Sequence, residues 1–276
     1  MIDEGAAVTV RPGAEPFARD GDDVGVLLCH GFTGNPSSLL SWAEGLAEAG
    51  RTVRLPRLPG HGTSPRDLAL TGWSDWSAEV DAAFHDLRRS CRVVVVGGLS
   101  MGGALALRLA QTYGPAMNPG PLPGVDGVIL VNPAVHLDDR RLAALPALRW
   151  VLPWLPPVGN DVKRPGAQED AYDRIPPHAL HSMLRGFRSV AADLPAVSQP
   201  VLLFRSSEDH VVPASSSALI LDRVTSARAD EVILRDSYHV ATIDNDADEI
   251  LRRSLTFIDE LAVGAQPTTR TTEGVR

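Results

Sequence analysis

The chain of 276 residues has few cysteines and no long apolar segment. Two cysteines, Cys29 and Cys91, are too few for a disulfide framework, and Cys29 ends an apolar run, as a small buried side chain would. No apolar run reaches the length of a membrane-spanning helix. The N-terminal stretch also lacks the basic start and apolar core of a secretory signal. We therefore expect a cytoplasmic protein.

Positive charge is scarce relative to negative charge. The net charge is −8, the basic residues are nearly all arginine, and Lys163 is the only lysine. No basic cluster resembles a nucleic-acid-binding arm, and an acidic protein is repelled by phosphate backbones, so no nucleic-acid partner is expected. With 44% hydrophobic and 22% charged residues, the composition is that of a globular protein with a large core.

Short apolar runs alternate with segments of helical spacing. This pattern predicts strands over 24–29, 51–55, 93–96, 127–131, 201–204 and 231–234, and helices over 37–49, 73–89, 101–113, 214–224 and 246–262. The run of four valines at 93–96 is typical of a central parallel strand. Apolar strands that alternate with helices indicate an α/β protein whose mostly parallel sheet has helices on both faces.

The segment 135–195 interrupts this alternation. It has no strand signal, contains many prolines and carries apolar helical pieces at 142–155 and 178–194. We expect it to form a helical cap inserted between two strands, so that 1–134 and 196–263 make up the core domain. The polar tail 264–276 is predicted to be disordered.

The strongest chemical signal is the sequence Gly98-Leu99-Ser100-Met101-Gly102, between the valine strand and an Ala- and Leu-rich helix. A serine on a tight strand-to-helix turn needs small neighbours, because the backbone folds sharply there. Such a turn raises the hydroxyl above the sheet and points the first amides of the helix at a reacting carbonyl. The alternative is a Gly/Ser turn that only links the two elements.

A serine hydroxyl becomes a nucleophile when a base takes its proton. Of the eight histidines, His239 is the candidate, because it follows the last predicted strand and parallel strands end at one sheet edge. Asp209, after the strand at 201–204, would fix the imidazole tautomer. The order Ser100, Asp209, His239 is that of α/β-hydrolases. Glu208 is the alternative acid.

The other histidines are weaker candidates. His85 lies within a helix and is expected at the surface. His178 and His181, at i and i+3 in the cap, could form a metal pair, but no carboxylate or cysteine accompanies them. We therefore expect neither a metal nor a cofactor.

The oxyanion of an acyl-transfer reaction needs two hydrogen-bond donors. One should be the backbone N–H of Met101, the residue after the nucleophile. The second is expected from the loop 30–34, where Gly31 allows close approach and Phe32 N–H is the candidate. His30 is interpreted as a structural hydrogen-bonding group. The alternative is that this loop is simply a turn.

Six motifs occur in the order HGFTG, PGHG, TGWSDW, GLSMGG, SSEDHVVP and SYHVATID. With them the chain resembles bacterial monoacylglycerol lipases and related carboxylesterases of the α/β-hydrolase superfamily, over residues 20–262. The resemblance implies the triad Ser100, Asp209 and His239, with an oxyanion hole formed by Phe32 and Met101. The Pro- and Trp-rich cap departs from the charged cap helices expected of that family, which leaves acyl-chain length and alcohol preference open.

The residues and the resemblance together predict an esterase that cleaves monoacylglycerols or other short-to-medium acyl esters through an acyl-enzyme. Its partner would be a small ester or lipid, with transient contact between the cap and a lipid surface. Apolar cap residues would enclose the acyl chain, although they could equally pack on the domain beneath; they are Leu152, Trp154, Leu155 and Met183.

Other functions fit parts of the pattern. An acyltransferase would use the same triad with an alcohol or sugar acceptor, and a non-catalytic binding protein could share the fold. A peptidase or amidase is less expected, because no charged feature would obviously capture a peptide terminus. Ser100 argues against dehalogenases and epoxide hydrolases of this fold, which use an aspartate at that turn.

Overall fold

One mostly parallel sheet forms the centre of the molecule, as predicted. The computed structural model describes residues 9–114, 124–157 and 160–264. The strand order is β1-β3-β2-β4-β5-β6-β7; β1 pairs antiparallel with β3, and the other neighbours are parallel. The strands are β1 Phe17–Arg19, β2 Val24–Cys29, β3 Thr52–Leu55, β4 Val93–Leu99, β5 Gly127–Val131, β6 Val201–Ser206 and β7 Ala229–Leu234.

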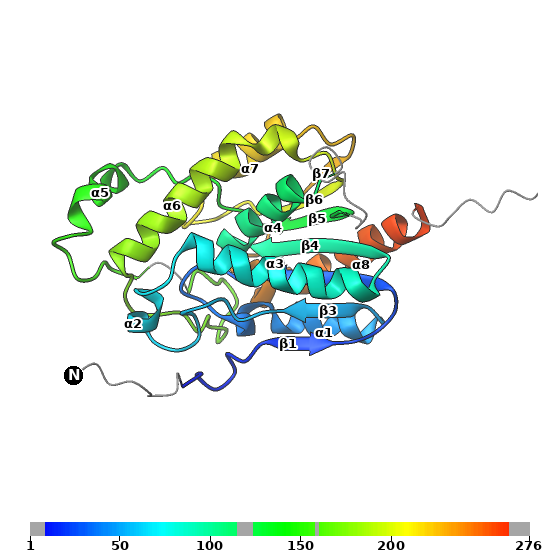
Figure 1. Cartoon of the computed structure of the whole chain (residues 1–276), viewed down its shortest axis with the longest axis horizontal. Helices are drawn as coiled ribbons and strands as arrows, with labels where there is room; N and C mark the ends of the chain where they lie inside the picture. The colour runs from blue at the N-terminus through cyan, green and yellow to red at the C-terminus, as the bar shows by residue number, and fades with distance from the viewer. Residues whose placement is uncertain (1–8, 115–123, 158–159, 265–276) are drawn as a thin grey trace, which may run out of the picture.

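Helices cover both faces of the sheet (Figure 1). The helices α1 and α8 pack together on one face, while α3 and α4 pack on the other. In the described residues no helix is long and apolar enough to cross a membrane. The α-helices are α1 Leu40–Glu48, α2 Pro65–Leu68, α3 Trp73–Ser90, α4 Met101–Thr112, α5 Leu145–Leu148, α6 Pro177–Ala192, α7 Ala214–Arg223 and α8 Ala247–Gly264; the 3-10 helices are η1 Pro36–Leu39, η2 Arg140–Ala144, η3 Leu194–Ala196 and η4 Ala241–Ile243.

The valines of β4 explain the two-sided core. Successive side chains of a strand point to opposite faces, so Val94 and Val96 pack into the cluster under α3 and α4, whereas Val93 and Val95 pack into the cluster under α1 and α8. All four are fully buried. A central strand covered on both faces needs an unbroken apolar run, which is the pattern that predicted it.

The segment between β5 and β6 leaves the sheet and carries η2, α5, α6 and η3. Its longest helix, α6, contacts α3 and α4 and agrees with the prediction for 178–194. The predicted helix at 142–155 is wrong: η2 and the four-residue α5 occupy its first part, and turns follow. Prolines at 146 and 153 explain the difference, because a proline fits the first turn of a helix but interrupts its interior.

Several short elements escaped prediction, among them β1 and α2. The edge strand β1 has only three residues and no apolar alternation, and α2 is a single turn capped by Ser64. β1 forms because β3 supplies its hydrogen bonds. For α2, Ser64 followed by Pro65 is a local start signal, but no apolar periodicity follows it. The disordered tail is predicted to begin at 264, but Gly264 is the last residue of α8; the remainder of the predicted tail, 265–276, lies outside the described residues.

Candidate active site

Ser100 occupies a sharp turn between β4 and α4. Its backbone angles are φ 57° and ψ −118°, which a non-glycine residue adopts only where the surroundings enforce them. A methyl group on Gly98 would lie 2.4 Å from the Gly102 carbonyl carbon, and one on Gly102 would lie 1.8 Å from the Cys29 carbonyl oxygen. The turn therefore needs glycine at both positions.

His239 and Asp209 meet from the loops that follow β7 and β6. His239 Nδ1 lies 2.8 Å from Asp209 Oδ2, and the side chains are 7% and 8% exposed. The other oxygen, Oδ1, accepts hydrogen bonds at 2.8 Å from the backbone N–H groups of Val211 and Val212. Burial would raise the pKa of Asp209, but the hydrogen bond and charge of His239, together with those N–H groups, hold this pKa below its ordinary value.

These contacts define the tautomer of the imidazole. An ionised carboxylate can only accept, so His239 Nδ1 donates to Asp209, and in the neutral ring Nε2 carries the lone pair that a general base needs. Glu208, the alternative acid, is directed elsewhere: its side chain is 60% exposed and lies 3.8 Å from the Lys163 ammonium. The geometry therefore favours Asp209 over Glu208.

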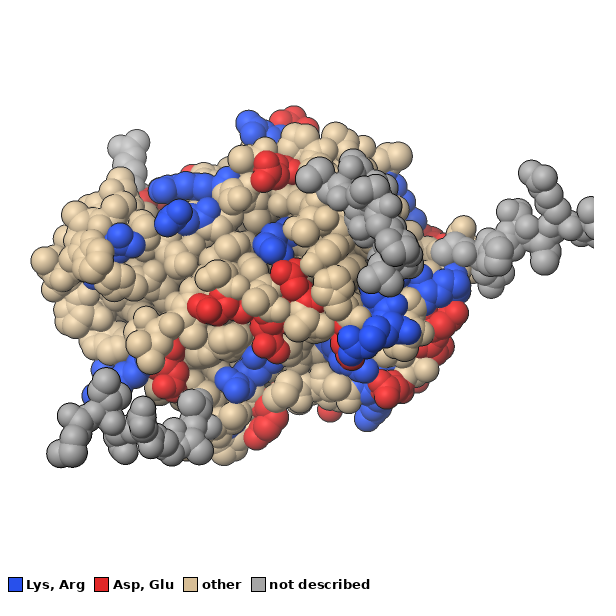
Figure 2. Space-filling model, in the orientation of Figure 1, with Lys and Arg blue, Asp and Glu red and all other residues tan. Residues whose placement is uncertain are grey.

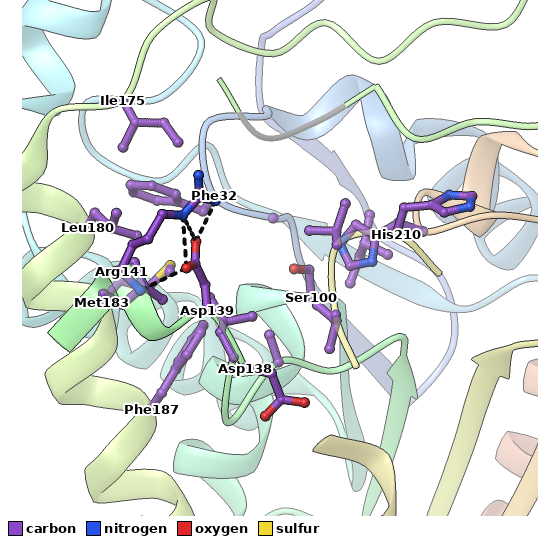
Figure 3. A pocket seen from close by; sticks show the side chains of 18 of the residues that line it. Phe32, Ser100, Asp138, Asp139, Arg141, Ile175, Leu180, Met183, Phe187 and His210 are labelled. Atoms are coloured by element: carbon purple, nitrogen blue, oxygen red, sulfur yellow. Dashed lines mark hydrogen bonds and ion pairs between the residues drawn. The ribbon is translucent and has the colours of Figure 1, made fainter. Parts of the chain in front are cut away.

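A cavity of about 380 Å³ is lined by both Ser100 and His239. In the view of Figure 3, Ser100 lies between an apolar wall that includes Met183 and Phe187 and, on the other side, His210. Among the described residues Ser100 Oγ has no hydrogen bond to His239. Such contacts are often long in the free enzyme and shorten when substrate binds.

The cavity wall is apolar over most of its extent and charged at a few points. Its volume falls in the range that binds small molecules. Besides the residues already named, its apolar members include Ala134, Leu137, Leu142, Ile175 and Leu180, and its charged members are Asp138, Asp139, Arg141 and Glu169. This combination suits a substrate with an apolar part and a polar part.

Only one of the four cap residues predicted to contact substrate lines this cavity, namely Met183. Leu152 is 37% exposed, Trp154 stacks against the Arg174 guanidinium at 5.6 Å, and Leu155 pairs its backbone with Ile175. These three residues lie outside the lining of this cavity, and their predicted contact with the acyl chain stays a prediction.

Glu169 is a cavity residue that sequence reasoning missed. Glu169 N–H donates to Asn160 Oδ1 at 3.0 Å, and Asn160 N–H donates to Glu169 Oε2 at 3.2 Å. A methyl group on Gly34 would lie 2.7 Å from Glu169 Oε1, so the carboxyl sits against the loop after β2. Burial raises the pKa of Glu169, although the hydrogen bond from Asn160 and the charge of His239 oppose it. No local pattern at 168–170 marks this role.

The loop after β2 lies next to Ser100, as expected for an oxyanion loop. A methyl group on Gly31 would lie 3.7 Å from Ser100 Cβ. His30 is fully buried; its Nε2 accepts a hydrogen bond from Leu58 N–H at 3.1 Å, and its Nδ1 donates to the Gly31 carbonyl at 2.9 Å. Burial lowers the pKa of His30 to about 4, so the ring is neutral and holds the loop.

The side chain of Phe32 is held by aromatic neighbours. Its ring lies 5.7 Å from that of Trp76 and 6.1 Å from that of His61, between centroids. Met101, the other expected donor, is fully buried as the first residue of α4. The backbones expected to supply the two N–H donors therefore belong to well-packed segments next to Ser100.

Asn132, at the end of β5, is a second residue that sequence reasoning missed. Its φ is +42°, and its side-chain amide donates to the His239 carbonyl at 2.8 Å and to Ser206 Oγ at 2.9 Å. Asn132 Oδ1 accepts from Ser206 N–H at 2.7 Å. This buried amide therefore ties the loop of His239 to two central strands. The available signal was an asparagine directly after a strand, where left-handed backbone is tolerated.

The histidines of the cap make protein contacts. His181 Nδ1 lies 2.8 Å from the Arg149 guanidinium, and the His178 ring packs edge-on against Trp150 at 4.9 Å. Burial and the charges of nearby arginines lower the pKa of His181. In the described part of the chain, no group of three metal-ligating side chains comes together.

The strand order, the serine turn after β4, and the acid and base after β6 and β7 are the features of an α/β-hydrolase. The family model described as serine aminopeptidase S33 (Hydrolase_4) matches residues 23–246, and the chain belongs to this family. Over 249 residues the chain is 41% identical to a thermostable monoacylglycerol lipase of Bacillus sp. (strain H-257), covering 90% of this chain and 95% of that protein.

Two further comparisons agree with this assignment. A carboxylesterase of Bacillus subtilis (strain 168) is 24% identical over 248 residues, covering 90% of this chain and 97% of the relative. A structure from work on the metagenome-derived lipolytic enzymes LipS and LipT superposes with a TM-score of 0.86 at 41% identity, covering 91% of this chain and 100% of the other. The resemblance identified from the sequence motifs is thereby confirmed.

Proposed function

We propose that this protein is a serine hydrolase of carboxylic esters, with monoacylglycerols or other short-to-medium acyl esters as substrates. The observation that carries the proposal is the His239–Asp209 hydrogen bond of 2.8 Å at a cavity that Ser100 also lines. The identity with a monoacylglycerol lipase, 41% over nearly the whole chain, supports this substrate class.

The mechanism follows from the roles of the three side chains. His239 Nε2 takes the proton of Ser100 Oγ as the oxygen attacks the ester carbonyl, and Asp209 stabilises the resulting imidazolium. The N–H groups of Phe32 and Met101 bind the developing oxyanion, each contributing about 3 kcal/mol to barrier lowering. The alcohol leaves with the proton from His239, and water then hydrolyses the acyl-enzyme by the same steps.

The cavity offers different surroundings to the acyl chain and to the alcohol of the substrate. The acyl chain would lie along the apolar wall that contains Met183 and Phe187, where each buried methylene contributes about 0.8 kcal/mol. Glu169, whose carboxyl sits against the loop of Gly34, would accept hydrogen bonds from hydroxyl groups of the alcohol. A glycerol ester presents both features.

The test is a panel of monoacylglycerols and methyl esters of graded chain length. We expect turnover that depends on chain length, a preference for the glycerol ester over the methyl ester of the same acid, and loss of that preference in Glu169→Ala, which removes the acceptor oxygens. Ser100→Ala should be inactive on every substrate. Equal rates for glycerol and methyl esters would contradict the role of Glu169, and a flat response to chain length would contradict the acyl site.

Aminopeptidase activity is a second candidate, favoured by the family description and by the carboxyl of Glu169, which could bind an ammonium group. The raised pKa of Glu169 and the apolar wall favour a neutral ester instead. Amino-acid p-nitroanilides at neutral pH distinguish the two, because an esterase should leave them intact. Added alcohol acceptors test for acyl transfer in the same assay through the products formed.

A lipid substrate would bring the cap to a lipid surface. Exposed apolar side chains gather around α5, where Trp150 is 71% and Val151 72% exposed, and Figure 2 shows few charged side chains at that end of the molecule. Binding to phosphatidylcholine vesicles should weaken in Trp150→Ser. We further propose a cytoplasmic location, supported by Cys29 and Cys91, which are both buried and unpaired.

A further inference from the structure

Asp161 lies where the cap segment returns to the sheet edge, next to the loops of the acid and the base. Its side chain is only 14% exposed, yet it takes no part in the acyl transfer described above. The preceding residue, Asn160, holds Glu169 at the cavity wall. The dipeptide therefore contacts the substrate site on one side and the triad loops on the other.

The Asp161 carboxylate bridges two loops. Its Oδ2 accepts hydrogen bonds from the backbone N–H of His210 at 3.1 Å and of His239 at 3.2 Å. Its Oδ1 lies 2.8 Å from His210 Nδ1, and its backbone carbonyl accepts from Val240 N–H at 3.1 Å. Because His210 directly follows Asp209, one side chain holds both the neighbour of the acid and the base itself.

A second carboxylate fixes the position of Asp161. Asp244 is 1% exposed and accepts hydrogen bonds from Lys163 N–H at 2.7 Å and Arg164 N–H at 2.8 Å, just beyond Asp161. It also accepts from Tyr238 N–H at 2.9 Å, the residue before the base. Hydrogen bonds to ionised acceptors are stronger than neutral ones, so this stretch of the cap is firmly joined to the base loop.

We propose that Asp161 is a positioning residue of the triad. By accepting hydrogen bonds from the backbone N–H groups of His210 and His239, it holds the loops of Asp209 and His239 at a fixed separation. The proposal rests on the proposed function, since it takes His239 as the base. The two loops follow separate strands, β6 and β7, and the acid–base hydrogen bond requires a fixed separation between them. Asp161 supplies this from a third segment and so couples the cap to the catalytic geometry.

The Asp161 carboxylate could instead act through its ion pair with the His210 ring. An ion pair with a ring that is 60% exposed is worth little by itself, and it requires the negative charge of Asp161. The backbone contacts require only an acceptor oxygen. Asp161→Asn keeps that oxygen and removes the charge, so it separates the two explanations.

The experiment compares Asp161→Ala, Asp161→Asn and the control Asp173→Ala in the full chain with p-nitrophenyl acetate, which is too short to report on the acyl wall. Asp173 is in the same segment, but its side chain is 72% exposed and pairs with Arg174. A displacement near 1 Å can cost about 100-fold in rate. We expect kcat of Asp161→Ala to fall about 10- to 100-fold with KM within about threefold, and Asp161→Asn to keep at least about a third of kcat.

The proposal is overturned if kcat of Asp161→Ala stays within about threefold of Asp173→Ala, or if Asp161→Asn loses as much as Asp161→Ala. Circular dichroism at the assay temperature checks folding. Should the alanine variant not fold, Asp161→Ser takes its place under the same criteria, because its short side chain cannot span both loops. Turnover in Ser100→Ala would instead refute the proposed function, whatever Asp161 does.

Discussion

Replacing Gly102 by alanine should damage both stability and catalysis, because the added methyl group meets backbone rather than a movable side chain. Its Cβ would lie 1.8 Å from the Cys29 carbonyl oxygen and 2.4 Å from the Cys29 carbonyl carbon, whereas real Cβ atoms essentially never approach closer than 3.0 Å. The start of α4 and the end of β2 must therefore separate by about 1 Å or more.

The size of the effect follows from where that movement occurs. Cys29 immediately precedes the loop of Gly31 and Phe32, and Gly102 follows Ser100 by two residues. Separation moves the oxyanion donor away from the nucleophile, and a misplacement near 1 Å can cost about 100-fold in rate. Overpacking of this kind costs about 2 kcal/mol, which lowers Tm by about 4–8 °C in a protein of this size.

The assay is kcat/KM on a short aryl ester together with Tm from thermal unfolding. The matched control is Gly264→Ala at the end of α8, where an added methyl group would meet nothing within 4 Å. We expect Gly264→Ala to behave as the unchanged protein. If Gly102→Ala has kcat/KM and Tm close to those of the control, the interpretation of the turn as tightly packed around Ser100 is refuted.

Replacing Asp209 by asparagine should lower kcat by about 10⁴-fold, while Glu208→Gln, whose side chain is 60% exposed, should leave kcat near its original value; equal losses in steady-state assays would contradict the assignment. The pKa of His30 is lowered to about 4 in the folded protein. Below about pH 6.5, His30 therefore binds a proton in the unfolded chain but stays neutral in the folded chain. The free energy of unfolding should then fall by up to about 3 kcal/mol between pH 6.5 and 4, and urea titrations showing no fall would count against it. In Met183→Ala, the ratio of kcat/KM for dodecanoyl to butyryl esters should drop about tenfold, with no change in Leu152→Ala, which lies outside the cavity.

The central strands and the serine turn could be predicted because their sequence patterns are local. Four consecutive valines fit a strand covered on both faces, and the glycines stand at a fixed spacing around Ser100, although the contact that requires Gly102 is with Cys29, far away in the chain. The parallel sheet then brings Asp209 and His239 to the same edge, which follows from topology and needs no knowledge of side-chain packing.

The cap could not be predicted at the same level. The apolar spacing at 142–155 indicated a helix, but prolines limit it to α5 and leave Trp154 outside the cavity. Glu169 and Asp161 escaped notice because their roles depend on partners far along the chain, such as Gly34 for one and His239 for the other. A polar residue in a loop carries no periodic pattern that would reveal such partners.

The most direct test of the central claim is covalent labelling with a fluorophosphonate, followed by peptide mapping by mass spectrometry. The account predicts a single adduct on Ser100, no adduct in Ser100→Ala, and labelling that is slowed at least about 100-fold in His239→Ala. An adduct on another residue, or labelling of Ser100 at an unchanged rate in His239→Ala, would contradict it.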